Sequence, residues 1–264
     1  MNLLRTALIE KIGRDNGFEH EVAVYPELLT LGSARHRTRA SIGLTDQPYR
    51  VELTTQTPAL YRELERQFER GSSGEFMADS ESELARLLHR TAALAQALPN
   101  QAETDYSVRV NKSLKDLPTT ILGTEVERMV RQRVGQDVFR KAQMDYWGSA
   151  CAVTGIAVPE VLRASHAKPW AECVSDAERL DVFNGFLLSA NLDALFDRCL
   201  ISFDDEGVLL ASESIPESER SALGLTLPAR LRWVNDQHLP YLRYHRKQFA
   251  SPKQSIGTWY NWLS

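Results

Sequence analysis

The stretch from Cys151 to Asp205 decides the fold, and four of its segments carry the pattern: C-A-V-T-G (151–155), A-S-H-A-K-P-W (164–170), N-G-F-L-L (184–188) and N-L-D-A-L-F-D-R (191–198). His166 follows an apolar segment, 158–162, and lies just before Pro169, which interrupts regular backbone hydrogen bonding. The pattern predicts a short strand that ends at the imidazole of His166.

A partner strand and a helix are predicted directly downstream. Asn184-Gly185 ends a polar loop and begins an apolar run, 186–188, which is typical of the second strand of a hairpin. From about 191 to 198 the apolar residues recur at helical spacing: Leu192, Leu195 and Phe196. Asp193 and Asp197 are four residues apart there, so their carboxylates share one face of the helix. A histidine on the first strand and carboxylates on the helix outline a hydrolytic metal site.

The same stretch resembles the HNH endonuclease family, whose site is a ββα-metal finger. It is closest in pattern to restriction-type bacterial nucleases with C-A-V-T-G, S-H-x-K-P-W, N-G and L-D-A-L-F-D, and the resemblance spans roughly 135–249. The resemblance implies metal-dependent hydrolysis of DNA, with Mg²⁺ or Mn²⁺ as the cofactor. It also implies a role in restriction or anti-phage defence, for which modified DNA is a candidate substrate.

The resemblance assigns roles to single residues. His166 corresponds to the general base, because a neutral imidazole can take a proton from water. Asp193 corresponds to the metal ligand, and Asp197 is a second candidate ligand one turn later; carboxylate oxygens suit Mg²⁺ or Mn²⁺. Asn184 corresponds to the middle asparagine of the signature and would brace the loop 171–183.

Two positions differ from the common family pattern. Ser165 stands where many members carry an acidic residue or a histidine that binds the metal, and Asp193 stands where many carry histidine or asparagine. Asp193 could supply the charge that Ser165 lacks.

Plainer interpretations stay open for each of these residues. His166 could be a histidine whose hydrogen bonds are satisfied at a strand end, and Asn184 could belong to an ordinary Asn-Gly turn. The aspartates could lie on a solvated helix face, with Asp197 paired to Arg198. The rival functions are a degenerate finger that binds DNA or another partner without cutting, and a nuclease for RNA or single strands.

Charge and composition bear on whether the chain binds nucleic acid. The net charge of −4 does not by itself indicate a nucleic-acid binder, but arginines alternate at strand spacing at positions 35, 37 and 39. We expect Arg35, Arg37 and Arg39 to contact the DNA backbone. Further candidate contacts, for which ordinary surface charge is the plainer interpretation, are Lys168, Arg198 and His245.

Cysteine usage and hydropathy indicate a cytoplasmic protein. Cys151, Cys173 and Cys199 form no C-x-x-C pair, so we expect small buried side chains rather than a zinc site. No apolar run approaches the roughly 20 residues that span a bilayer, and the start of the chain mixes charges with apolar residues. No membrane partner is expected.

We predict an α+β protein in which a mixed α/β recognition domain, 1–117, precedes an HNH nuclease domain, 118–264. The first domain should begin with a helix whose apolar face includes Leu3 and Leu4, followed by about three antiparallel strands between His20 and Leu53. A linker is expected in 99–104 or 112–123. Cleavage of both strands of a duplex needs two active sites, which favours a homodimer.

Overall fold

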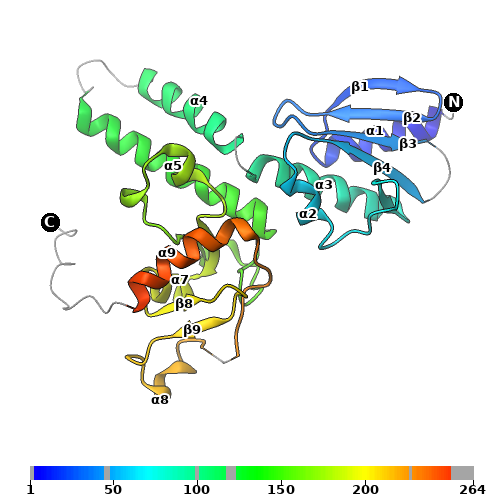
Figure 1. Cartoon of the computed structure of the whole chain (residues 1–264). Coiled ribbons are helices and arrows are strands. Elements are labelled where there is room, and N and C mark those ends of the chain that lie inside the picture. Colours follow the sequence, from blue (N-terminus) through cyan, green and yellow to red (C-terminus); the bar gives the residue numbers. More distant parts are fainter. Residues whose placement is uncertain (1–2, 45–47, 99–100, 117–122, 226–227, 251–264) are drawn as a thin grey trace. The chain divides into compact units, whose positions relative to one another are not determined.

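The computed structural model describes residues 3–44, 48–98, 101–116, 123–225 and 228–250 (Figure 1). The chain divides into two compact units, Met1–Gly148 and Ser149–Ser264. Each unit combines helices with antiparallel strands, in agreement with the predicted α+β class. Within the described ranges, no helix has both the length and the apolar character needed to cross a membrane.

The first unit contains a five-stranded antiparallel sheet whose strands are neighbours in chain order. The strands are β1 (His20–Tyr25), β2 (Leu28–Gly32), β3 (Arg39–Gly43), β4 (Tyr49–Thr54) and β5 (Phe76–Ala78). Alternate residues of the central strands are buried, as the period-two pattern predicts: Ala40, Ile42 and Val51 are fully inaccessible. β5 is a strand that the sequence pattern did not indicate.

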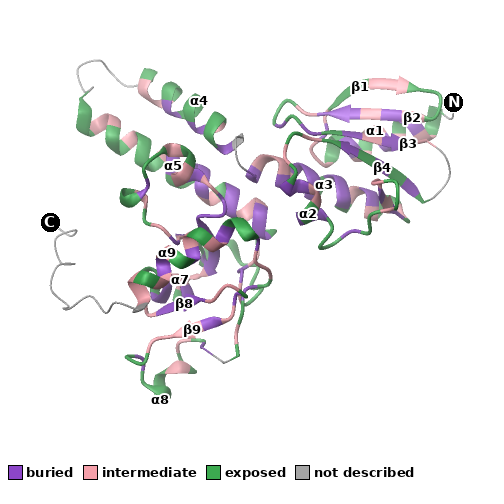
Figure 2. Ribbon diagram, in the orientation of Figure 1, coloured by how far each residue is buried: buried purple, intermediate pink, exposed green. Residues whose placement is uncertain are grey.

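Five helices complete this unit: α1 (Leu3–Asp15), α2 (Ala59–Leu64), α3 (Glu81–Ala97), α4 (Gln101–Lys115) and α5 (Thr124–Trp147). α3 packs against α1, α2 and β5 and therefore forms the centre of the unit (Figure 2). Its start follows the expected capping pattern, because the Ser80 hydroxyl accepts the Glu83 N–H.

The predicted apolar face of the first helix is wrong. Leu3 and Leu4 are 71% and 85% exposed, whereas α1 buries Thr6, Ile9 and Gly13. The cause is a close approach to β2: a Cβ added at Gly13 would lie 2.2 Å from Leu31 Cδ1. Glycine therefore lets the helix backbone rest on the sheet, and that contact, rather than the leucine spacing, fixes which face is buried.

The expected linker contains a helix. α4 covers 101–104 of the first predicted linker range and 112–115 of the second, while 99–100 and 117–122 lie outside the described residues. α5 runs through Gly135 as one helix. α5 packs against α3 and α4, so it belongs to the first compact unit, although the predicted split assigned it to the nuclease domain. Its N-cap is Gly123.

The second unit is built on two hairpins. β6 (Leu162–His166) pairs with β7 (Gly185–Ser189), and β8 (Ile201–Phe203) pairs with β9 (Leu209–Ala211), both antiparallel. Gly207 has φ +80° between the strands of the second hairpin, a conformation that favours glycine. The helices are α6 (Asp176–Leu180), α7 (Ala190–Asp197), α8 (Glu217–Arg220) and α9 (Leu239–Ala250), with single 3₁₀ turns at Pro159–Val161, Trp170–Glu172 and Asp236–His238.

An aromatic core joins the second hairpin to the helices around it. Phe186 of β7 packs edge to face on Phe196 of α7 and also contacts Phe203 of β8. All three rings are fully inaccessible to solvent. This core fixes α7 against the hairpin that carries His166.

Candidate active site

The hairpin β6–β7 and helix α7 form the strand, loop, strand and helix order predicted from the sequence. Their register places Ser165 opposite Phe186 and His166 opposite Gly185, and α7 begins directly after Ser189. Neighbouring residues of a strand point to opposite faces, so Ser165 and His166 leave β6 on different sides. The site therefore has a serine side and a histidine side.

On the serine side, the Ser165 hydroxyl donates a hydrogen bond to Asp193 Oδ1. Ser165 is buried, so this bond fixes a carboxylate of the first turn of α7 against the strand. Ser165 thus orients the acidic residue that the family resemblance identifies as the metal ligand.

Asp197 lies one turn further along α7. Although the residue as a whole is exposed, the surrounding protein desolvates its carboxyl group, and the charge of Asp193 adds to this effect; together they raise its pKa to about 6. A cation shared by the two carboxylates would offset the effect of the Asp193 charge on Asp197.

On the histidine side, His166 Nε2 lies 2.8 Å from the carbonyl oxygen of Arg179. A carbonyl only accepts hydrogen bonds, so Nε2 carries the proton and Nδ1 carries the lone pair of the neutral ring. Burial lowers the His166 pKa to about 4, against the opposing effect of this hydrogen bond. The imidazole is therefore a neutral acceptor at physiological pH.

Asn184 holds the loop between the two strands. The side chain is fully inaccessible, and its Oδ1 accepts the Lys168 N–H at 2.8 Å. Its Nδ2 lies within donating distance of Lys168 O, Cys173 Sγ and Glu178 O, at 3.2, 3.3 and 3.1 Å. These contacts are those expected of a bracing residue rather than of an ordinary turn asparagine.

Sequence reasoning missed Arg179 as a part of this loop. Its guanidinium donates to the carbonyl oxygens of Cys173 and Trp170, at 2.6 and 3.2 Å, while its own carbonyl holds His166. A backbone carbonyl has no side-chain signature, so no motif points to it. The signal that was present is the capping pattern S-D-A-E, in which the Ser175 hydroxyl accepts the Glu178 N–H and starts α6.

Cys151 was also unassigned apart from its expected burial. Its thiol is inaccessible and accepts the backbone N–H groups of Thr154 and Ser189, at 3.4 and 3.3 Å. Ser189 is the N-cap of α7, so the thiol fastens the C-A-V-T-G turn to the start of the helix that carries the aspartates.

The prediction that His245 contacts nucleic acid is corrected. The residue is 4% exposed, and its ring stacks on Phe196 with centroids 3.8 Å apart and an interplanar angle of 6°. Its ring nitrogens bond to Ser202 Oγ and to the carbonyl oxygen of Phe196. His245 therefore packs α9 onto β8 and α7.

The predicted cationic contacts are placed differently from one another. Lys168 is half-buried and pairs with Glu178 at 2.7 Å, and this lysine is the main cause of the lowered pKa of Glu178. Arg198 is exposed next to Asp197. Arg35, Arg37 and Arg39 are all exposed and alternate with buried residues, but only Arg39 lies in a strand.

The side chains proposed to bind a divalent metal are Asp193 and Asp197 of α7. Among the residues that the structure describes, no three histidine, cysteine, aspartate or glutamate side chains are grouped to hold an ion. Two carboxylates on one helix face nevertheless fit Mg²⁺, which keeps several waters and commonly binds through one or two carboxylates.

A hairpin that carries a histidine, followed by a helix that carries two carboxylates, is the ββα order that the sequence predicted. Comparison with known families agrees: residues 151–204 match the model described as HNH endonuclease. The resemblance inferred from the sequence is confirmed for this segment, and the match supports a nuclease, hence a hydrolase that acts on nucleic acid. A comparison with curated proteins found no match.

Proposed function

We propose that this chain is a divalent-metal-dependent endonuclease that hydrolyses phosphodiester bonds of DNA. The observation that carries the proposal is the fixed, neutral imidazole of His166 on the hairpin whose following helix bears Asp193 and Asp197. The nuclease family match at 151–204 supports the same reaction class.

His166 acts as the general base in this proposal. Its Nε2–H stays on the Arg179 carbonyl, so the lone pair of Nδ1 is the position that accepts a proton from water. A pKa of about 4 makes the free imidazole a weak base. Binding of an anionic phosphodiester nearby would raise that pKa, because negative charge stabilises the imidazolium.

Asp193 and Asp197 would hold Mg²⁺ or Mn²⁺, with Ser165 orienting Asp193. When bound, the cation would offset the negative charge that accumulates on the phosphate. Asn184 keeps the loop in place and Arg179 keeps the imidazole oriented. The role that fits a DNA endonuclease of this family is restriction or anti-phage defence. A homodimer would follow from the need for two active sites on a duplex.

Plasmid cleavage tests the proposal. Supercoiled DNA is incubated with the full chain and Mg²⁺ or Mn²⁺, with and without base modification, and His166→Ala is compared with His20→Ala, an exposed histidine of the other unit. Nicking or linearisation that is lost only in the His166 variant supports the endonuclease.

Two results would favour a different function. Binding without cleavage under all metals and DNA substrates tried would identify a non-cutting binding module. Preferential cleavage of RNA or single strands in competition with duplex DNA would identify the third candidate. Sedimentation of the chain with and without DNA tests the homodimer.

A further inference from the structure

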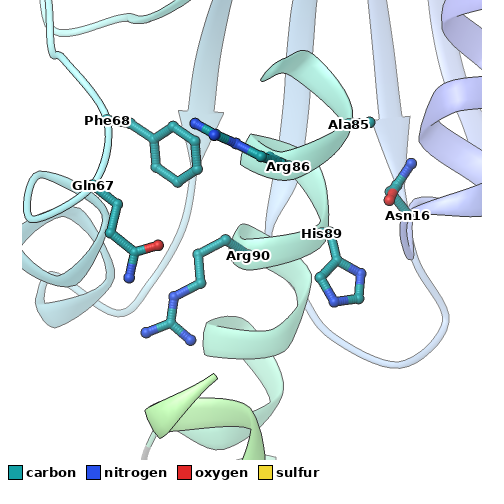
Figure 3. A pocket seen from close by; sticks show the side chains of 7 residues that line it. All are labelled: Asn16, Gln67, Phe68, Ala85, Arg86, His89 and Arg90. Carbon is teal, nitrogen blue, oxygen red and sulfur yellow. The ribbon is translucent and has the colours of Figure 1, made fainter. Parts of the chain in front are cut away.

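A hollow of about 640 Å³ lies on the exposed face of α3 in the first unit. Its lining includes Asn16, Gln67, Phe68, Arg86, His89 and Arg90, and we call it the α3 pocket (Figure 3). α3 forms its floor, with Gln67 and Phe68 on one side and Asn16 on the other. Sites for small molecules are typically about 300–1,000 Å³, so the volume suits a ligand of nucleotide size.

The pocket is cationic. Arg86 lies three residues before His89 and four before Arg90 on α3, so each of the two is a neighbour of Arg86 on the helix surface. No aspartate or glutamate is among the described residues that line it. The nearest acidic partner of Arg86 is Glu83, at 3.5 Å, in a pair whose arginine side chain is 67% exposed. Such a loose pair leaves the guanidinium able to bind a further anion.

Arg90 supplies a fixed cation at the bottom of the pocket. It is 7% exposed, and its NH1 and NH2 groups donate to the carbonyl oxygens of Asp145 and Tyr146, at 2.6 and 2.7 Å. Both acceptors lie in the last turn of α5, which belongs to the same unit. The guanidinium is therefore held in one position before any ligand arrives.

The uncharged lining suits a flat ring with polar edges. The Arg86 guanidinium lies 5.7 Å from the centroid of Phe68, so a planar cation and an aromatic ring stand together at one side. Asn16 donates to the Ile12 carbonyl through Nδ2, and its Oδ1 can accept a hydrogen bond. Gln67 is an exposed amide that can donate and accept. Arginine planes and amides are the groups that stack on bases and read their edges.

We propose that the α3 pocket binds a phosphorylated nucleotide, with Arg86 and His89 contacting its phosphate. Within the proposed function, which this inference rests on, the nucleotide belongs to the DNA substrate, and the pocket is where the first unit grips it. The exposed arginines at 35, 37 and 39 are not among the residues that line this pocket.

The test measures DNA binding by the full chain without cleavage. Anisotropy of a labelled duplex is followed in EDTA for Arg86→Gln with His89→Gln. Arg128→Gln is the matched control, because Arg128 is also an exposed arginine on a helix, three residues after its glutamate partner. We expect the pocket variant to bind about 10-fold more weakly with a salt slope smaller by about one, and the control to bind as the unchanged chain does.

Free nucleotides separate the two sources of this chemistry. Titration calorimetry with dAMP and with inorganic phosphate reports whether the pocket binds a mononucleotide outside a strand. Saturable dAMP binding that the pocket variant loses, with unchanged duplex affinity, would assign the pocket to a free nucleotide. Unchanged duplex affinity together with no dAMP binding would overturn the proposal. Matching urea unfolding curves for variant and control exclude loss of folding.

The inference and the proposed nuclease can fail separately. If cleavage needs His166 but the pocket variant binds duplex DNA normally, the proposal that the pocket grips the DNA substrate fails and the nuclease proposal stands. If DNA binding depends on the pocket residues but no cleavage occurs, the nuclease proposal fails and the pocket proposal stands.

Discussion

Two histidines of the second unit, the half-buried His166 in the β6–β7 region and the buried His245 in the α9 region, have similar electrostatic surroundings. Each has Nε2 on a backbone carbonyl, at 2.8 and 3.0 Å, and burial lowers each pKa to about 4. The two histidines differ in the other contacts of the ring and in the elements around it. The Ser202 hydroxyl, 2.9 Å away, donates to Nδ1 of His245, whose ring stacks on Phe196, whereas His166 ends a strand in the hairpin followed by the carboxylate helix. A lowered pKa therefore does not distinguish the histidine proposed as the general base from a packing histidine, and the proposal depends on the surrounding elements instead.

The sharpest test of this comparison is alanine at each position. We expect His166→Ala to lower the cleavage rate by about 10²- to 10⁴-fold, because general base catalysis contributes on this order. His245→Ala should keep most of the rate of its folded fraction. The measurement is single-turnover plasmid nicking at a temperature where both variants are folded by circular dichroism; an equal loss in both would break the distinction.

Asp193 and Ser165, the serine that orients it, should contribute differently to metal binding. We expect Asp193→Asn to raise the Mn²⁺ concentration needed for half-maximal cleavage by about 100-fold, and Ser165→Ala by about 10-fold, since the serine only orients the ligand. Metal titrations of nicking check this, with Asp205→Asn, a carboxylate paired with Arg243 and Arg246 elsewhere in the unit, as the control. If Asp193→Asn needs the same Mn²⁺ concentration for half-maximal cleavage as the unchanged chain, Asp193 is not a metal ligand.

The packing role of His245 predicts a stability effect where His166 has an activity effect. His245→Ala leaves a cavity beside Phe196 and removes the partner of the Ser202 hydroxyl. We expect a loss of about 2–4 kcal/mol in the free energy of unfolding. Urea unfolding measures it. A loss below about 0.5 kcal/mol would mean that α9 is not held through this ring.

Acid should destabilise the second unit through both histidines. The folded pKa of each is about 4, and the unfolded value is about 6.5. Between these values the unfolded chain binds more protons, so stability is complete above about pH 6.5 and falls as the pH drops toward 4. The slope should approach about 1.4 kcal/mol per pH unit for each histidine in the middle of that window. His245→Gln should remove one of the two contributions in urea unfolding at pH 7 and pH 5.

The sequence predicted the parts of the site that depend on the spacing of apolar residues and on residues that begin or end a strand or helix. The strand before Pro169, the partner strand after Asn184 and the helix with Asp193 were all indicated by side chains. The orientation of His166 was not, because it depends on the carbonyl of Arg179, and every residue type has a carbonyl. The catalytic and metal-binding roles of these residues stay predictions.

Elsewhere, tertiary contacts overrode local pattern. The burial of α1 follows from the close approach at Gly13, which an apolar face with Leu3 and Leu4 does not reveal. A linker was predicted at 99–104 or 112–123, yet α4 extends into both ranges and buries Ala102, Tyr106 and Val110. His245 was predicted as a candidate nucleic-acid contact, but its ring is buried and stacked on Phe196.

The amide of Asn184 has a consequence for how a substrate meets this site. Because one side chain ties together the loop backbone at Lys168 and Glu178, the conformational entropy of the loop is lost when the protein folds. Association with a phosphodiester then requires little further ordering of that segment. Recognition at the hairpin will therefore resemble docking onto a rigid surface, with amide exchange in the loop already slow in the unliganded protein.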